Sequence, residues 1–444
     1  MLLRFKVSNY KSFLNEIEFS MLPAPKQKGL EYSLFRERFR GRSLKVLSSS
    51  VVYGPNASGK TNMIGAMDVL RSIVLEGDIK NGEKVISPNN AAAFLELIPN
   101  SKLNKSKPVN FEIDFMEGDL RIQYNLSLDL GTFLISDYKR RILKEDLIVN
   151  GYEIFNRSQE INIKNTKELK RFTSIDDEKQ IADLVSIATN SLDPQELFLT
   201  NGFRLLFSVQ LAQFVMDWFA NKFLVIYRAD AVQILDRKKD YKKGVGIYLE
   251  KTLRKATGLF GVGENELGYT AVEDEQKPML YSIFGKKDNL AIPAEVYESF
   301  GTLRFINIFP LVIRAIKSGG TLVVDEFDAS IHPMALMSII NIFHNDDINV
   351  NKAQLVFNTH NPIFLNQNLF RRDEIKFVER DEDNGSVLYS LSDFGTSGRG
   401  GVRKNEDYMK NYFVSRYGAI KEIDFTPVFE NLLKDENEVL HDEE

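Results

Sequence analysis

One stretch of eight residues, Gly54-Pro-Asn-Ala-Ser-Gly-Lys-Thr61, constrains what this chain can fold into more than any other part of the sequence. It matches the pattern G-x-x-x-x-G-K-[ST] at every fixed position. The apolar run over 45–53 predicts a buried strand before the loop. After the loop, apolar residues at helical spacing predict a helix through Met63, Ile64, Ala66, Met67, Leu70 and Ile73. A strand, a glycine loop and a helix in this order indicate a phosphate-binding loop and disfavour an ordinary Gly/Ser turn.

The chemistry expected of this loop is the binding of ATP and Mg²⁺. The backbone N–H groups of residues 56–61 can form a concave anion site at the helix N-terminus. Lys60 is expected to reach the β- and γ-phosphates and to assist catalysis, and the Thr61 hydroxyl to bind the metal. The residues of the loop predicted to contact nucleotide are Gly54, Pro55, Asn56, Ala57, Ser58, Gly59, Lys60 and Thr61.

Composition indicates the class of protein and the cellular location in which this chemistry would occur. With 43% hydrophobic and 27% charged residues, the chain has the composition of a soluble globular protein. No apolar run approaches the roughly 18 residues of a membrane span, and the N-terminus lacks the apolar segment of a signal peptide. The absence of Cys excludes disulfides, a thiol nucleophile and a cysteine zinc site. A cytoplasmic location with no membrane partner is therefore expected.

Charge is distributed unevenly along the chain. The net charge of −5 counts against a uniformly basic nucleic-acid binder. A basic run, Arg36-Glu-Arg-Phe-Arg-Gly-Arg42, lies in a Pro- and Gly-containing stretch, 21–44, that predicts a loop or hairpin arm. Such a run is usually a solvated face, and contact with phosphates is the alternative.

The hydrophobic pattern predicts three regions. Alternating residues over 1–20 predict two strands, and those over 109–149 predict an antiparallel meander. The first region is expected over 1–150 and contains the phosphate loop, the second is a mainly helical insertion over 151–285, and the third covers 286–444. The predicted fold class is α/β, with the meander and the helical insertion.

Two acids follow a short apolar strand in the C-terminal half. Thr321-Leu-Val-Val-Asp-Glu326 has the form of a Walker B strand. Asp325 is predicted to hold Mg²⁺, and Glu326 to position or deprotonate the attacking water. Two acids at the end of a buried strand need a cation to compensate their burial. The alternative, a strand that merely enters a polar loop, is disfavoured by the phosphate loop upstream.

A histidine follows the next predicted strand. Ala353-Gln-Leu-Val-Phe-Asn-Thr-His360 has the pattern of a buried strand that ends at a polar tip. A lone histidine is usually structural. Here the strand is the next one predicted after Asp325, so both tips should lie at one sheet edge. His360 is therefore predicted to act near the γ-phosphate as a polar sensor.

The order of these motifs resembles the ABC-type ATPase head of SMC and DNA-repair ATPases. Phe327-Asp-Ala-Ser-Ile-His-Pro333 resembles the D-loop of that family, and Thr359-His360 its switch histidine. Ser299-Phe-Gly-Thr302 sits where the family carries its Ser-Gly-Gly signature and departs from it at Phe300. This degenerate form resembles the OLD-like ATPases of bacterial antiphage defence and abortive infection. Two further stretches resemble that subgroup, Asn9-Tyr-Lys-Ser-Phe13 and 411–420.

The resemblance covers about 1–140 and 290–420, and it implies that the first and third regions are the two halves of one ATPase head with a mixed central sheet. It also implies an ATP site shared between two subunits. In this family two heads sandwich ATP, and the signature of one head completes the phosphate loop of the other. Ser299 and Gly301 are thus implied to touch the γ-phosphate held by a second copy, in a homodimer or a higher oligomer. No Q-loop glutamine can be assigned.

The resemblance also implies a function for this chain and a separate effector protein that acts with it. OLD nucleases carry a C-terminal Toprim domain, but only 84 residues follow His360 (444 − 360). The acids at 381–383 fit a solvated hairpin turn better than a metal centre. Relatives without Toprim work with a separately encoded effector, often a nuclease. The chain is thus expected to be the ATP-hydrolysing sensor or scaffold of a defence complex, triggered by nucleic acid or a phage protein.

Two other functions stay open at this point. The first is a DNA-repair ATPase of the SMC type that binds DNA directly. The second is a transporter ATPase subunit, which the long insertion between phosphate loop and signature disfavours.

Overall fold

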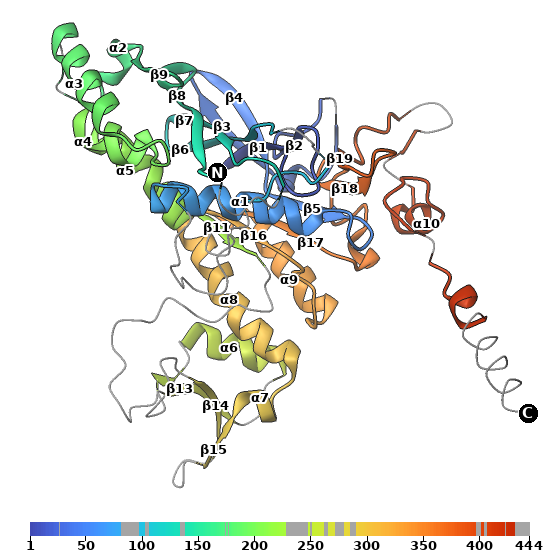
Figure 1. The fold of residues 1–444 in the computed structure, drawn as a ribbon. Coiled ribbons are helices and arrows are strands. Elements are labelled where there is room, and N and C mark those ends of the chain that lie inside the picture. The colour runs from blue at the N-terminus through green and yellow to red at the C-terminus, as the bar shows by residue number, and fades with distance from the viewer. Residues whose placement is uncertain are drawn as a thin grey trace, which may run out of the picture.

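The computed structural model describes residues 1–25, 27–80, 97–102, 106–133, 138–173, 175, 177–227, 247–248, 251–261, 265–270, 279–284, 290–396, 401–403, 406–421 and 423–430. These residues make a mixed α/β fold. Helix α1 (Lys60–Glu76) lies between two large sheets, with the antiparallel sheet on one side and the central sheet on the other (Figure 1). The helix that follows the phosphate loop is therefore covered on both sides.

The central sheet has the strand order β11-β16-β17-β5-β18-β19, and all its pairings are parallel except that between β18 and β19. This confirms the predicted mixed central sheet. Because β5, β16 and β17 are adjacent and parallel, their carboxyl ends meet at one edge of the sheet. The strands are β5 (Ser49–Tyr53), β11 (Phe223–Ile226), β16 (Thr321–Val324), β17 (Gln354–Asn358), β18 (Ile375–Arg380) and β19 (Ser386–Ser390).

The second sheet is an antiparallel meander with the order β10-β9-β8-β7-β6-β1-β2. Its first five strands in chain order match the alternating patterns that predict it. The strands are β1 (Leu2–Ser8), β2 (Ile17–Ser20), β6 (Val109–Glu117), β7 (Leu120–Asp129), β8 (Arg141–Val149), β9 (Tyr152–Arg157) and β10 (Ile161–Ile163).

The meander continues past residue 150, where a helical insertion was expected to begin. Asn150 (φ 55°) and Gly151 (φ 84°) form a two-residue turn between β8 and β9. Both positions need positive φ, which Asn and Gly tolerate best, so Asn-Gly is a strong hairpin signal. Residues 152–163 therefore add two strands to the sheet.

The segment 151–285 also contains strands beyond residue 163. Strand β11 lies at the apolar run 223–227, where the sequence pattern predicts a strand, and it pairs with β16 in the central sheet. Strands β12, β13 and β14, together with β15, form a small antiparallel sheet that the sequence pattern did not predict. The division of the chain at 150 and 285 stays a prediction. The strands are β12 (Ile247–Tyr248), β13 (Glu266–Thr270), β14 (Met279–Phe284) and β15 (Leu290–Pro293).

The described residues of this segment and of the C-terminal half also form helices. Helices α8 and α9 pack on the face of the central sheet opposite α1 (Figure 1). The helices of the segment are α2 (Thr166–Leu169), α3 (Glu178–Ser191), η2 (Leu199–Phe203), α4 (Arg204–Leu206), α5 (Val209–Asp217), η3 (Trp218–Lys222) and α6 (Lys251–Phe260). Those that follow are α7 (Ala294–Tyr297), α8 (Phe300–Ser318), α9 (Pro333–Phe343), η5 (Pro362–Phe364) and α10 (Tyr408–Phe413).

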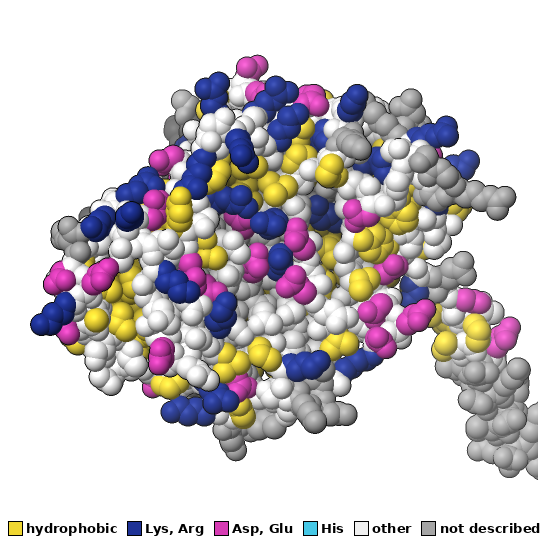
Figure 2. Space-filling model, turned by 90° about the horizontal axis from the view of Figure 1, so that it is seen from above, with side chains coloured by type: hydrophobic (Ala, Val, Ile, Leu, Met, Phe, Trp, Pro, Cys, Tyr) yellow, Lys and Arg dark blue, Asp and Glu magenta, His cyan; other side chains and the backbone are white. Residues whose placement is uncertain are grey.

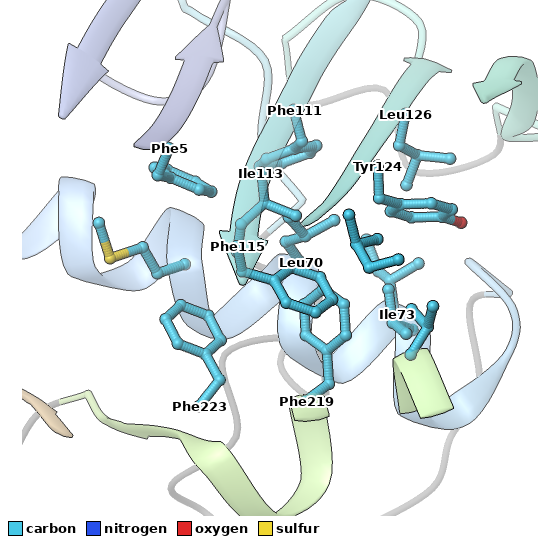
Figure 3. Close-up of a cluster of buried hydrophobic side chains, with 14 of the residues drawn as sticks. Phe5, Leu70, Ile73, Phe111, Ile113, Phe115, Tyr124, Leu126, Phe219 and Phe223 are labelled. Carbon is cyan, nitrogen blue, oxygen red and sulfur yellow. The ribbon is translucent and has the colours of Figure 1, made fainter. Parts of the chain in front are cut away.

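The largest core lies where α1 meets the meander. Leu70 and Ile73 of α1 face aromatic and aliphatic side chains of β6 and β7 (Figure 3). Phe115 stacks on Trp218 with ring centroids 3.8 Å apart, so the 199–222 helices close this core. Burial of each such ring contributes roughly 2–3 kcal/mol, which fixes α1 and the phosphate loop at its N-terminus.

A separate two-stranded ribbon precedes β5. It consists of β3 (Leu34–Phe39) and β4 (Arg42–Leu47) after the short helix η1 (Glu31–Ser33). A hairpin is thus present where 21–44 predicts a loop or a hairpin arm, but it extends to Leu47. The strand expected over 45–53 is therefore divided between the end of β4 and β5.

Candidate nucleotide-binding site

The phosphate loop turns between the end of β5 at Tyr53 and the first residue of α1, Lys60. Glycine is required at both ends of the loop. A Cβ at Gly54 would lie 2.2 Å from the carbonyl oxygen of Val378, and one at Gly59 would lie 2.4 Å from Ser386 Oγ. Gly59 also has a φ of +116°, which side chains rarely adopt. Residues of β18 and β19 therefore lie so close to the loop that only glycine fits at these two positions.

Lys60 bends back over the loop. Its Nζ donates hydrogen bonds to the carbonyl oxygens of Gly54 (2.7 Å) and Pro55 (2.9 Å). Burial lowers the pKa of Lys60 to about 8, although the carboxylates of Asp325 and Glu326 oppose this shift. The Ser58 hydroxyl is buried and has no hydrogen-bond partner among the residues that the structure describes. A buried ammonium and an unused hydroxyl in one loop suit an anion with several oxygens.

The metal-binding residues predicted from sequence lie beside each other. Thr61 Oγ1 donates a 3.1 Å hydrogen bond to Asp325 Oδ1, across 264 positions of the chain. Asp325 is only 3% exposed. A hydroxyl and a carboxylate are hard oxygen ligands, and two protein ligands are the number that Mg²⁺ commonly takes when it keeps several waters. The donor set therefore fits Mg²⁺.

Glu326 has an exposed side chain and a firmly held backbone. It adopts a φ of +48°, in the left-handed region. Its N–H donates to Asn358 Oδ1, and its carbonyl oxygen accepts from the guanidinium of Arg304. The carboxylate can thus meet water while the peptide on each side of it is fixed.

His360 lies within electrostatic reach of the same groups. Desolvation and the Lys60 cation lower the pKa of His360, whereas the carboxylates of Glu326 and Asp328 raise it. The net lowering keeps the ring neutral at pH 7, so it can donate or accept a hydrogen bond. Lys60, Thr61, Asp325, Glu326 and His360 therefore gather at one sheet edge, and their roles in the reaction stay predictions.

Ser299 and Gly301 are not part of that gathering. Ser299 caps α8, because its Oγ accepts the N–H of Thr302 at 3.1 Å. Gly301 packs against the loop after β16, where a Cβ would lie 2.3 Å from the carbonyl oxygen of Ser330. Within the described part of the chain, no hydrogen bond or ion pair joins either residue to residues 54–61.

Two residues of the site were not predicted from the sequence. Asn358 Nδ2 donates a 2.6 Å hydrogen bond to Asp325 Oδ1, and Arg304 reaches the loop after β16 from α8. The position of Asn358 carried a usable signal, because it is an amide at the end of a buried strand next to the Asp325 strand. Arg304 carried none, since its contact depends on how α8 packs.

A glycine loop between strand and helix, with a lysine, a threonine and a facing acid, defines a P-loop nucleotide-binding protein. A family model described as "AAA domain, putative AbiEii toxin, Type IV TA system" matches residues 49–366, and the chain belongs to this family. The matched range contains the phosphate loop, Asp325, Glu326 and His360.

The chain is also similar to two solved SMC heads. One is described as an SMC head bound to the C-winged helix domain of ScpA, with 11% identity, a TM-score of 0.38, and coverage of 88% of this chain and 97% of that chain. The other is the SMC head domain from Thermotoga maritima, with 14% identity, a TM-score of 0.34, and coverage of 88% and 98%. Neither likeness carries a conclusion about this chain. No curated protein matches it.

Among the helices that the structure describes, none has both the length and the apolar character needed to cross a membrane.

Proposed function

We propose that this protein binds and hydrolyses ATP as the sensor or scaffold subunit of a bacterial antiphage defence complex, and that it controls a separately encoded nuclease effector. The observation that carries the ATPase part is the convergence of Lys60, Thr61, Asp325 and Glu326 at one sheet edge. The family description, which names a putative AbiEii toxin, supports the abortive-infection context.

Each side chain has a distinct task in the proposed reaction. Thr61 and Asp325 would hold Mg²⁺, which neutralises charge on the β- and γ-phosphate oxygens. Lys60 would exchange its two carbonyl partners for phosphate oxygens. Glu326 would accept a proton from the attacking water, and the neutral His360 would bond to the γ-phosphate.

The second part of the proposal is a homodimer that shares its ATP sites. Phe300 is 83% exposed beside Ser299, and Met334 is 65% exposed just after the loop that Gly301 contacts. Exposed large apolar side chains next to Ser299 and next to the loop that Gly301 contacts support a protein partner there. In a second copy this face would complete the phosphate loop, and Ser299 would approach the γ-phosphate at the α8 N-terminus.

The alternative is an SMC-like DNA-repair ATPase that binds DNA directly. The observation that favours it is the exposed basic hairpin of β3 and β4. The two functions differ in their need for an effector, because a repair ATPase would not require a toxic partner.

Two measurements test the proposal. Phosphate release by the purified protein should be abolished in Lys60→Ala, and its absence in the wild type would overturn the ATPase part. Phage plating on cells that carry the gene with its neighbours should show protection that Lys60→Ala removes. Protection that persists after each neighbouring gene is deleted would contradict the two-component part.

A further inference from the structure

The β3–β4 hairpin presents arginines on its solvent side. Arg36 pairs with Lys45 across the ribbon, and Arg38 pairs with Ser43. Residues directly opposite each other share one face of a ribbon, so these cations lie on the same side. Arg40 (φ 49°) and Gly41 (φ 74°) form the tip. The ribbon therefore ends in a basic point.

The positive charge of the hairpin is only partly neutralised. Residues 36–45 contain five cations and one acid, in a chain with a net charge of −5. That acid, Glu37, forms an ion pair with Lys352 at 2.5 Å. Glu31, outside this stretch, forms ion pairs with Arg36 at 3.2 Å and with Lys45 at 3.5 Å. Arg38 and Arg42 form no ion pair with any residue that the structure describes. Two guanidinium groups thus face solvent without an acid.

An aromatic ring holds a third guanidinium in place. The Arg40 guanidinium carbon lies 4.9 Å from the ring centroid of Tyr152, which is 44% exposed on β9. Figure 2 views the molecule from above Figure 1 and shows Lys and Arg side chains gathered over the upper part of this face. A stacked arginine is oriented in advance for contact with a planar or anionic group.

The opposite face of the ribbon, which carries Arg42 beside the tip and opposite Phe39, anchors the hairpin to the core. Phe35 is 3% exposed and Val46 is fully buried, and both belong to the core beneath the meander. The hairpin enters β5 at its first residue, whereas the phosphate loop leaves β5 at its last. The hairpin is therefore fixed to the core at its base, and it joins β5 at the end away from the nucleotide, so ATP does not account for its charge.

We infer that this hairpin is a docking site for duplex DNA. A two-stranded ribbon fits the major groove of B-form DNA, and Arg38, Arg40 and Arg42 at its end would reach backbone phosphates. The deep, narrow major groove of an RNA duplex does not admit such a ribbon. The inference rests on neither ATP hydrolysis nor a defence role, so it can fail while both hold.

The test measures binding of the full-length protein to a fluorescent DNA duplex by anisotropy, at salt concentrations from about 50 to 300 mM. Arg38→Gln/Arg40→Gln/Arg42→Gln should weaken binding at least tenfold at the lowest salt. The slope of log affinity against log salt should become shallower by about 0.9 for each phosphate that the variant no longer neutralises. The matched control is Lys255→Gln/Lys317→Gln/Lys410→Gln, which removes three exposed cations from α6, α8 and α10 and should bind as the wild type does.

Two further measurements keep the outcome decisive. A variant with lysine at all three hairpin positions should retain most of the binding and the salt slope, which separates loss of charge from loss of fold. An RNA duplex of the same sequence should bind more weakly than DNA. The inference is overturned if the wild type does not bind duplex DNA at low salt, if the hairpin and control variants weaken equally, or if the RNA duplex binds as tightly as DNA.

Discussion

Asn358 and Asp325, at the ends of neighbouring parallel strands, are joined by a 2.6 Å hydrogen bond from the Asn358 amide to the carboxylate. The amide oxygen of Asn358 also accepts the N–H of Glu326. One buried side chain on β17 thus orients the proposed metal ligand, Asp325, and the proposed catalytic base, Glu326, together. It is a positioning residue, because it acts through its two neighbours.

Replacing Asn358 by Leu should impair turnover more than ATP binding. The substitution keeps the approximate volume but leaves Asp325 and the Glu326 N–H without this partner, which costs about 1–3 kcal/mol for a buried polar group. We expect kcat to fall at least tenfold and the Mg²⁺ concentration for half-maximal activity to rise. ATP affinity should change less than kcat. A variant with normal kcat and normal Mg²⁺ dependence would show that Asn358 does not position these acids.

ATP affinity should fall as the pH rises above about 8, because burial lowers the pKa of Lys60 to about 8. Below that pH Lys60 enters the binding reaction already protonated, and above it the amine must first take up a proton. Raising the pH from 8 to 9 should therefore weaken ATP binding several-fold, towards about a tenfold change for each further pH unit. Lys60→Arg, which stays protonated, should show no such dependence in calorimetry. Equal pH profiles for the two proteins would contradict this account.

Glu326→Gln should bind ATP and fail to hydrolyse it. The amide preserves shape and leaves the contact of Thr61 with Asp325 intact, but it cannot accept a proton from water. We expect turnover to fall by about two orders of magnitude or more with nearly unchanged ATP affinity. Wild-type rates of phosphate release would remove Glu326 from the proposed role.

A shared ATP site predicts complementation between two inactive variants. Ser299→Asp retains a good helix cap but adds a charge that should repel the γ-phosphate of the partner's ATP. Ser299→Asn, which caps without a charge, is the matched control and should stay active. A heterodimer of Ser299→Asp with Lys60→Ala contains one site with both defects and one with neither, so mixing should restore ATPase activity.

The position tested is Ser299 because Gly301 cannot be substituted cleanly. A side chain at Gly301 would meet the carbonyl oxygen of Ser330 at 2.3 Å, so inactivity of such a variant could reflect local distortion. A heterodimer of wild type with Glu326→Gln shows whether one intact site turns over. If one intact site is enough for ATPase activity, and confirmed heterodimers of the two inactive variants still hydrolyse no ATP, the sites are not shared.

The part of the candidate site that could be predicted from the sequence consists of polar residues that follow apolar strands. Lys60, Asp325 and His360 each follow a strongly apolar run, and parallel strands bring their carboxyl ends to one edge. The residues that hold this edge together were not predictable in the same way. Arg304 lies in a helix whose packing decides what its side chain reaches, and no local pattern encodes that contact. Strand β11 likewise joins the central sheet through pairing with β16, which its short apolar run does not reveal.

Arg304 lies in the second turn of α8 and binds the carbonyl oxygen of Glu326. The same helix begins at the capped residue Ser299, on the face proposed to receive a second copy. A small roll of α8 would pull on the peptide after Glu326, a residue already in the left-handed conformation. Through Arg304, α8 connects the proposed subunit contact to the backbone of the proposed base. Contact between subunits could thus set the angle of one carboxylate without any change in the nucleotide pocket itself.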